Sequence, residues 1–155
     1  MQDRFAKESK PAVPRMIFVN LPVADLPRAM AFYQALGFTN EPRFTDETAA
    51  CMVLSETIHV MLLTHAKWQT FTTRPIPTSD SSEVSLAVSC ESKEEVNRFV
   101  DIAGVYGGIA DVNPPEDHGF MFQRSFADLD GHVWEPMWMD PAVASGEAEM
   151  PELTA

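Results

Sequence analysis

The chain has 155 residues, of which 45% are hydrophobic, and it carries a formal net charge of −12 at pH 7. This length supports one domain with a substantial core, or two small modules that share one. The acidic balance argues against nucleic acid and anionic membrane surfaces as partners, because both need basic patches. No signal-peptide or membrane-spanning pattern is present, so we expect a cytoplasmic protein whose cysteines, Cys51 and Cys90, are free buried thiols.

The first half of the chain predicts an arm followed by one β-α-β-β-β module. Residues 1–15 are polar and contain prolines, which indicates a flexible N-terminal arm. A β-rich run at residues 16–22 is followed by Asp25 as a helix N-cap, by apolar residues at helical spacing, and by Gly37 as a helix stop. Short strands are expected at residues 39–45, 49–55 and 58–64. The first module therefore covers residues 16–65.

The second half repeats this order. A segment rich in Pro, Ser and Thr, residues 66–82, predicts a linker. A strand at 84–90 follows it, and then Ser92 and Glu95 form a capping box that starts a second helix. Further strands are expected at residues 109–113, 119–127 and 132–139. Residues 83–139 therefore form a second module of the same kind.

Duplication of one module determines the expected fold class. We expect an α+β fold in which two βαβββ modules form a cupped mixed sheet with helices on its outer face. Residues 140–155 are acidic and lack apolar periodicity, which predicts a flexible tail. A concave sheet with a few polar side chains inside is a natural site for a small molecule.

The last strand carries the clearest chemical signal. After a turn at residues 128–131, alternation places Glu135 on one strand face with Val133, Met137 and Met139. If that face is buried, Glu135 needs a cation, a metal or a hydrogen-bond donor, or it must hold its proton. Arg124 is one candidate partner, and it could instead bind an anionic substrate. The alternative is that Glu135 faces solvent near a strand end.

Two segments carry a resemblance to a known family. Residues 23–38 (VADLPRAMAFYQALGF) and 128–139 (DLDGHVWEPMWM) resemble the most recognisable segments of the vicinal oxygen chelate superfamily. That superfamily includes glyoxalase I, bleomycin-resistance proteins, extradiol dioxygenases and fosfomycin-resistance transferases. The resemblance covers residues 16–139 and implies two βαβββ modules that form a cup, commonly in a homodimer. It also implies, for many members, a divalent metal ion held at four positions.

Carried over to this chain, those four positions fall on Glu135, Phe18, Ser85 and Met61. Only Glu135 is a usual metal ligand. His59 shares a strand face with Met61, so a displaced site for one divalent metal ion, built on His59 and Glu135, is an alternative. Otherwise His59 is a strand histidine with a local hydrogen bond.

These residues leave three hypotheses. The first is a metal-independent small-molecule-binding protein, similar to the bleomycin-resistance proteins, whose ligand contacts come from Phe18, Asn20, Met61, Arg124 and Met137. The second is a metal-dependent lyase or dioxygenase that uses His59 and Glu135 as ligands. Glu135 and His118 are then the candidate catalytic residues, although the triplet around His118 also suits a plain turn. The third is a dimeric interaction protein with a closed cup.

Overall fold

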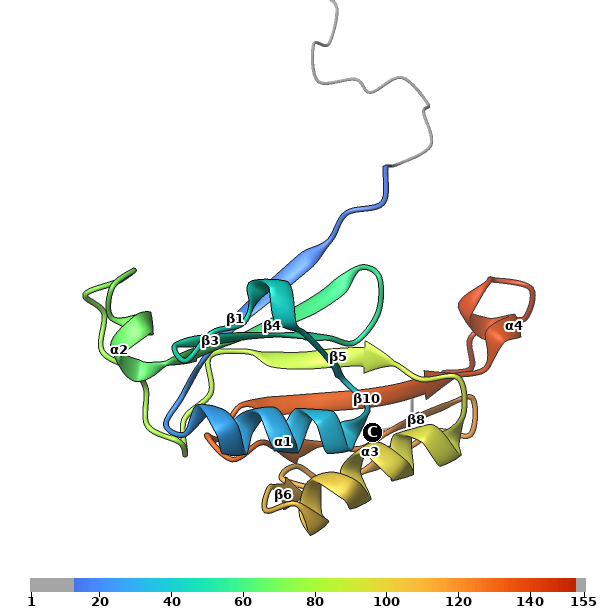
Figure 1. Cartoon of the computed structure of the whole chain (residues 1–155). Coiled ribbons are helices and arrows are strands. Elements are labelled where there is room, and N and C mark those ends of the chain that lie inside the picture. The colour runs from blue at the N-terminus through green and yellow to red at the C-terminus, as the bar shows by residue number, and fades with distance from the viewer. Residues whose placement is uncertain (1–12, 153–155) are drawn as a thin grey trace, which may run out of the picture.

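The computed structural model describes residues 13–152, so residues 1–12 of the expected arm and 153–155 of the expected tail lie outside it. The chain forms two sheets, with the long helices packed against them (Figure 1). Sheet A comes from the first half of the chain and sheet B from the second. This arrangement confirms the α+β fold class. None of the helices in the described range has the length and apolar character needed to cross a membrane.

Sheet A has four strands in the order β1-β4-β3-β2. Their bounds are Ile17–Val23 for β1, Thr39–Glu41 for β2, Ala49–Val53 for β3 and Ile58–Thr64 for β4. Strands β1 and β4 are parallel, and the other pairs are antiparallel. The strand expected at 39–45 ends early, in the 3-10 turn η1 (Pro42–Phe44), because Pro42 has no N–H to offer the ladder.

Helix α1 (Leu26–Leu36) covers one face of sheet A, as its sequence signals predict. The Asp25 side chain accepts a hydrogen bond from the Arg28 N–H at 3.1 Å, which satisfies one of the free donors of the first turn. Gly37 ends the helix with a φ of +107°, a conformation that side chains with a Cβ disfavour. The buried side of α1 consists of Leu26, Ala29, Phe32, Tyr33 and Leu36.

Sheet B has six strands, with β10 at its centre. The strand bounds are Ser85–Ser89 for β5, Ile109–Ala110 for β6, Glu116–Asp117 for β7, Met121–Gln123 for β8, Phe126–Ala127 for β9 and Val133–Met139 for β10. The single strand expected at 119–127 is broken into β8 and β9. In the antiparallel register Arg124 lies opposite Pro136, which cannot return a hydrogen bond, so the ladder is interrupted there. The strand expected at 109–113 keeps only its first two residues.

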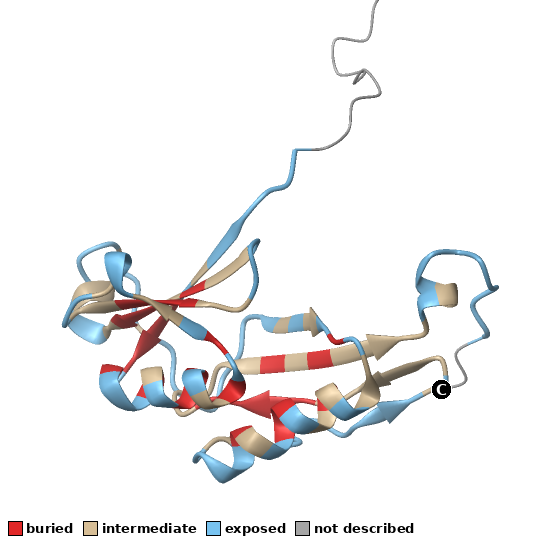
Figure 2. Ribbon diagram, turned by 45° about the vertical axis from the view of Figure 1, so that its right-hand side comes forward, coloured by how far each residue is buried: buried red, intermediate tan, exposed pale blue. Residues whose placement is uncertain are grey.

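The remaining helices are α3 (Lys93–Val105), capped by Ser92 as expected, and two single turns. Helix α2 (His65–Trp68) begins the segment expected to be a linker, and α4 (Pro141–Ala144) lies in the segment expected to be a tail. Helix α3 packs on β10 and also touches α1, so both helices belong to one core (Figure 2). Both cysteines are free and buried in this structure, as expected.

A buried polar network joins the two modules. The Tyr33 hydroxyl donates to Asp128 Oδ2 at 2.6 Å, and the Trp134 indole N–H donates to the Tyr33 oxygen at 3.1 Å. Asp128 Oδ1 accepts the backbone N–H groups of Asp130 and His132, both at 2.9 Å. Burial raises the pKa of Asp128 despite these bonds, and burial together with the Asp128 charge raises the pKa of Tyr33.

Arg124 holds the end of sheet B to helix α3. Its Nε and Nη2 donate to the two carboxylate oxygens of Asp111, both at 2.9 Å. Its Nη1 donates to Asn97 at 2.9 Å and to Asp101 at 3.1 Å. Such a two-pronged ion pair fixes geometry as well as charge, so Arg124 has a structural role.

We expect Tyr33→Phe to lower the free energy of unfolding by about 2 kcal/mol, because it leaves the Trp134 N–H and the Asp128 carboxylate without their buried partner. The measurement is urea denaturation followed by circular dichroism. Tyr106→Phe is the matched control, because the Tyr106 side chain is exposed. Equal stability of the two variants would show that the network does not stabilise the fold.

Candidate functional site

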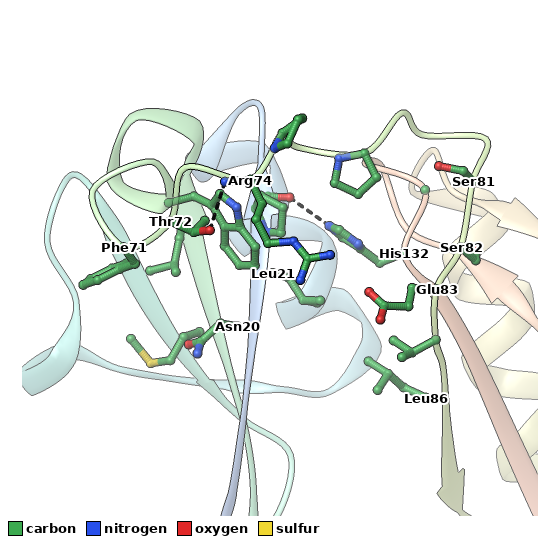
Figure 3. Close-up of a pocket in the computed structure, with 18 of the residues that line it drawn as sticks. Asn20, Leu21, Phe71, Thr72, Arg74, Ser81, Ser82, Glu83, Leu86 and His132 are labelled. Atoms are coloured by element: carbon green, nitrogen blue, oxygen red, sulfur yellow. Dashed lines mark hydrogen bonds between the residues drawn. The ribbon is translucent and has the colours of Figure 1, made fainter.

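A pocket of about 960 Å³ lies between sheets A and B and is bordered by the segment that links them (Figure 3). Each sheet contributes residues from the strand ends nearest that segment. The sheet A wall includes Asn20, Leu21, Pro22, Ala49, Met61 and Leu63. The sheet B wall includes Leu86, Gly131, His132 and Val133. The pocket is therefore built by both modules and depends on how they pack.

The sheet A wall follows from strand register. In the parallel pairing of β1 with β4, Asn20 lies opposite Met61 and Pro22 opposite Leu63. Directly paired residues point to the same side of a sheet, so these four side chains share the face that α1 does not cover. We call this side of each sheet the open face. On sheet A it also carries Phe18 and His59, and on sheet B it carries Gln123, Val133, Glu135 and Met137.

The third wall comes from the segment between the modules. Trp68 and Phe71 bring aromatic surface to it, and Lys67 and Arg74 bring positive charge. The ammonium group of Lys67 lies 5.5 Å from the centre of the Phe71 ring, a favourable cation–π distance.

Two contacts hold the pocket wall near the start of β10. His132 Nε2 forms a 2.8 Å hydrogen bond with the carbonyl oxygen of Pro22, which joins the two sheets. Gly131 has a φ of +88° and lies against the backbone of Ser79, where an added Cβ would be 2.0 Å from the carbonyl oxygen. A glycine is therefore required at position 131, both for its conformation and for its small size.

The site residues predicted from the sequence do not all lie in the pocket. Asn20 and Met61 line the pocket, but Phe18, His59, Glu135 and Met137 lie further along the open faces, outside its lining. His118 is also outside the lining. Its Nε2 lies 3.6 Å from a carboxylate oxygen of Glu116, and its ring is near that of Phe120.

Arg124, one candidate partner of Glu135, does not pair with it. Arg124 lies opposite Pro136 in the antiparallel register, so its side chain points to the helix side of sheet B and reaches Asp111, Asp101 and Asn97. Glu135, on the open face, instead accepts a 3.1 Å hydrogen bond from the Gln123 side-chain amide. A neutral donor on the neighbouring strand therefore compensates the half-buried carboxylate.

His59 stacks on Phe18, with ring centres 4.7 Å apart. Its Nδ1 atom is buried and has no hydrogen-bond partner within the described part of the chain. No hydrogen bond or ion pair in that part of the chain joins His59 to Glu135. The local hydrogen bond expected for His59 is thus absent at Nδ1.

Four residues stand at the positions where the superfamily resemblance implies metal ligands. Phe18 and Met61 lie on sheet A, Ser85 and Glu135 on sheet B, and only the last offers a strong ligand. Among residues 13–152, no three His, Cys, Asp or Glu side chains come close enough to hold an ion together.

Sequence analysis missed most of the pocket, because its third wall is the segment taken as a linker. The site residues predicted from the sequence do not include Lys67, Trp68, Phe71, Arg74 or His132. The available signal was the presence of aromatic and cationic residues in a segment otherwise rich in Pro, Ser and Thr.

Comparisons with known proteins agree with the observed fold. Residues 15–55 match the family described as bleomycin resistance protein-like N-terminal. A hypothetical protein from S. aureus, SA1046, is 27% identical, with a TM-score of 0.67 over 83% of this chain and 95% of that one. A glyoxalase-related enzyme from Fulvimarina pelagi is 19% identical, with a TM-score of 0.67 over 81% and 88%. No curated protein sequence matches the chain significantly.

A glyoxalase/bleomycin resistance protein/dioxygenase family enzyme from Burkholderia phytofirmans PsJN is 16% identical and superimposes with a TM-score of 0.66, covering 79% of this chain and 96% of that one. At this identity the likeness concerns the fold. Together with the match at the N-terminal module, it confirms the resemblance inferred from the two sequence segments. The chain therefore has the fold of glyoxalase and bleomycin-resistance proteins and is similar to the vicinal oxygen chelate superfamily.

Proposed function

We propose that this protein binds a small, largely apolar molecule in the pocket between its two sheets, without a metal at the four superfamily positions. The observation that carries the proposal is the pocket itself. Its volume of about 960 Å³ is that of a site for a drug-sized ligand, and apolar side chains dominate its sheet walls. Asn20 and His132 supply polar groups that would orient the molecule.

We further propose that the protein is a homodimer. Ile17 and Phe18 are 55% and 51% exposed on β1, an edge strand of sheet A, and the open face beyond the pocket carries Met137 on sheet B. An edge strand with exposed apolar side chains tends to pair or be covered. A second copy that covers the open faces would bury Phe18 and Met137.

A second candidate function is metal-dependent lyase or dioxygenase chemistry with His59 and Glu135 as ligands. The observation in its favour is the buried Nδ1 atom of His59, which has no partner among the described residues. Two protein ligands are fewer than the three that zinc-type sites normally use.

Pocket filling tests the main proposal. We expect the purified protein to bind Nile red, a neutral apolar dye, with one site per chain, and Met61→Trp to weaken that binding about tenfold or more, because the larger ring occupies the pocket. Fluorescence titration measures the affinity. Met139→Trp, on β10 outside the pocket lining, is the matched control. If Met61→Trp and the control bind equally well, the pocket is not the binding site.

Metal content separates the two candidate functions. If the main proposal is correct, we expect less than about 0.1 mol of divalent metal per mol of chain after purification without chelator. The reason is that the side chains at three of the four superfamily positions are weak metal ligands. Inductively coupled plasma mass spectrometry measures it, on the natural protein and on His59→Ala and Glu135→Gln. A stoichiometric metal that both substitutions remove would favour the metalloenzyme.

Dimer formation is tested at Phe18. We expect light scattering to give twice the mass of one chain for the natural protein, and the mass of one chain for Phe18→Glu, because a charge at this position would be costly to bury in an interface. Phe44→Glu is the control, since Phe44 is also exposed but lies on η1. A monomeric natural protein at 100 μM (roughly a hundredfold above a Kd of 1 μM), or a dimeric Phe18→Glu, would contradict the proposal.

A further inference from the structure

We infer that the ligand carries a single negative charge, such as a carboxylate or sulfonate, joined to its apolar body, and that Arg74 binds the charged end. This inference rests on the proposed function, because it presupposes that the pocket takes a small molecule. It names the chemical class of that molecule.

The first observation is the state of Arg74. Its guanidinium group points into the pocket, toward Leu21 and His132 (Figure 3). Within residues 13–152 this group forms no ion pair within 4.0 Å and donates no hydrogen bond. Its backbone, by contrast, is anchored, because the Arg74 N–H donates to Thr72 Oγ1 at 3.1 Å and its carbonyl oxygen accepts from Gln69 Nε2 at 3.3 Å. The structure thus holds the backbone and leaves the charged group available.

The second observation is where the unpaired cations lie. In the described range Arg43, Lys93 and Arg124 pair with carboxylates, whereas the other lysines and arginines do not. Of these unpaired cations, Lys67 and Arg74 both line the pocket. In a chain with 23 acidic and 11 basic residues, partners for a cation are abundant. Two unpaired cations on one pocket wall therefore mark a local positive region in an otherwise acidic protein.

The third observation concerns the number of negative charges that the ligand can carry. Glu83 is the one acidic side chain in the lining, and it lies across from Arg74 in Figure 3. A carboxylate or sulfonate can accept two parallel hydrogen bonds from a guanidinium group, which a neutral ligand cannot match in strength. A second negative charge would meet Glu83 and be disfavoured. The site therefore favours a monoanion.

The fourth observation concerns the rest of the ligand. Trp68 and Phe71 lie on the connecting segment together with Lys67 and Arg74. Met61 and Leu63 belong to the apolar wall that sheet A contributes. An aromatic or alicyclic body can be buried against these side chains while its acid group reaches Arg74. A simple inorganic anion would gain nothing from this apolar surface.

Two fluorescent probes of similar size test the inference on the full chain. Anilinonaphthalene sulfonate is an apolar monoanion, and Nile red is apolar and neutral. We expect Arg74→Gln to weaken binding of the sulfonate about tenfold or more and binding of Nile red less than about twofold, because only the sulfonate uses the charge. Arg28→Gln is the matched control, since Arg28 is exposed and outside the pocket. Thermal melts establish that both variants are folded.

Competition adds a second readout. 1-Naphthoate should displace the sulfonate, whereas 1-naphthylmethylamine, its cationic counterpart, should not. If Nile red binds but the sulfonate does not, or if Arg74→Gln and Arg28→Gln behave alike, the charge inference is wrong while the proposed binding function stands. If neither probe binds, the proposed function fails, and the inference fails with it.

Discussion

The hydrogen bond from Tyr33 to Asp128 is the interaction on which the rest of the structure depends. It joins helix α1 of the first module to the turn that starts β10 in the second, and Trp134 adds a donor from β10 itself. Every member of this group is buried, so an unpaired partner would cost more than the bond contributes. The relative position of the two sheets is therefore fixed at this point, through groups that cannot separate cheaply.

The turn before β10, residues 128–131, also shapes the pocket. Asp130 accepts a 2.8 Å hydrogen bond from the Ala24 N–H, next to the start of α1, and His132 bonds the carbonyl oxygen of Pro22. Gly131, between them, leaves just enough room for the backbone of Ser79. One short turn thus orients β10, holds the first module, and positions the connecting segment over the gap between the sheets. The stability of the fold and the shape of the pocket are therefore linked at this corner of the molecule.

Of the four positions that correspond to the superfamily metal site, Met61 lines the pocket and the other three lie outside its lining. Phe18, Met61 and Ser85 stand at three of those positions, and the fourth, Glu135, is hydrogen-bonded to Gln123. The charged groups that remain available lie instead on the segment between the modules, in Lys67 and Arg74. The pocket thus combines apolar sheet walls with two cations on the connecting segment.

The sequence by itself determined the local elements and their repetition. Capping by Asp25 and Ser92, the stop at Gly37, and alternation in β10 depend on neighbouring residues, so both long helices, the last strand and the family resemblance could be predicted. The partners of Glu135 and Arg124, and the pocket wall around Arg74, could not, because they depend on strand register and on a segment without regular periodicity. Which residues meet across the two sheets was decided only by tertiary packing, since the Tyr33–Asp128 contact spans 95 residues of chain.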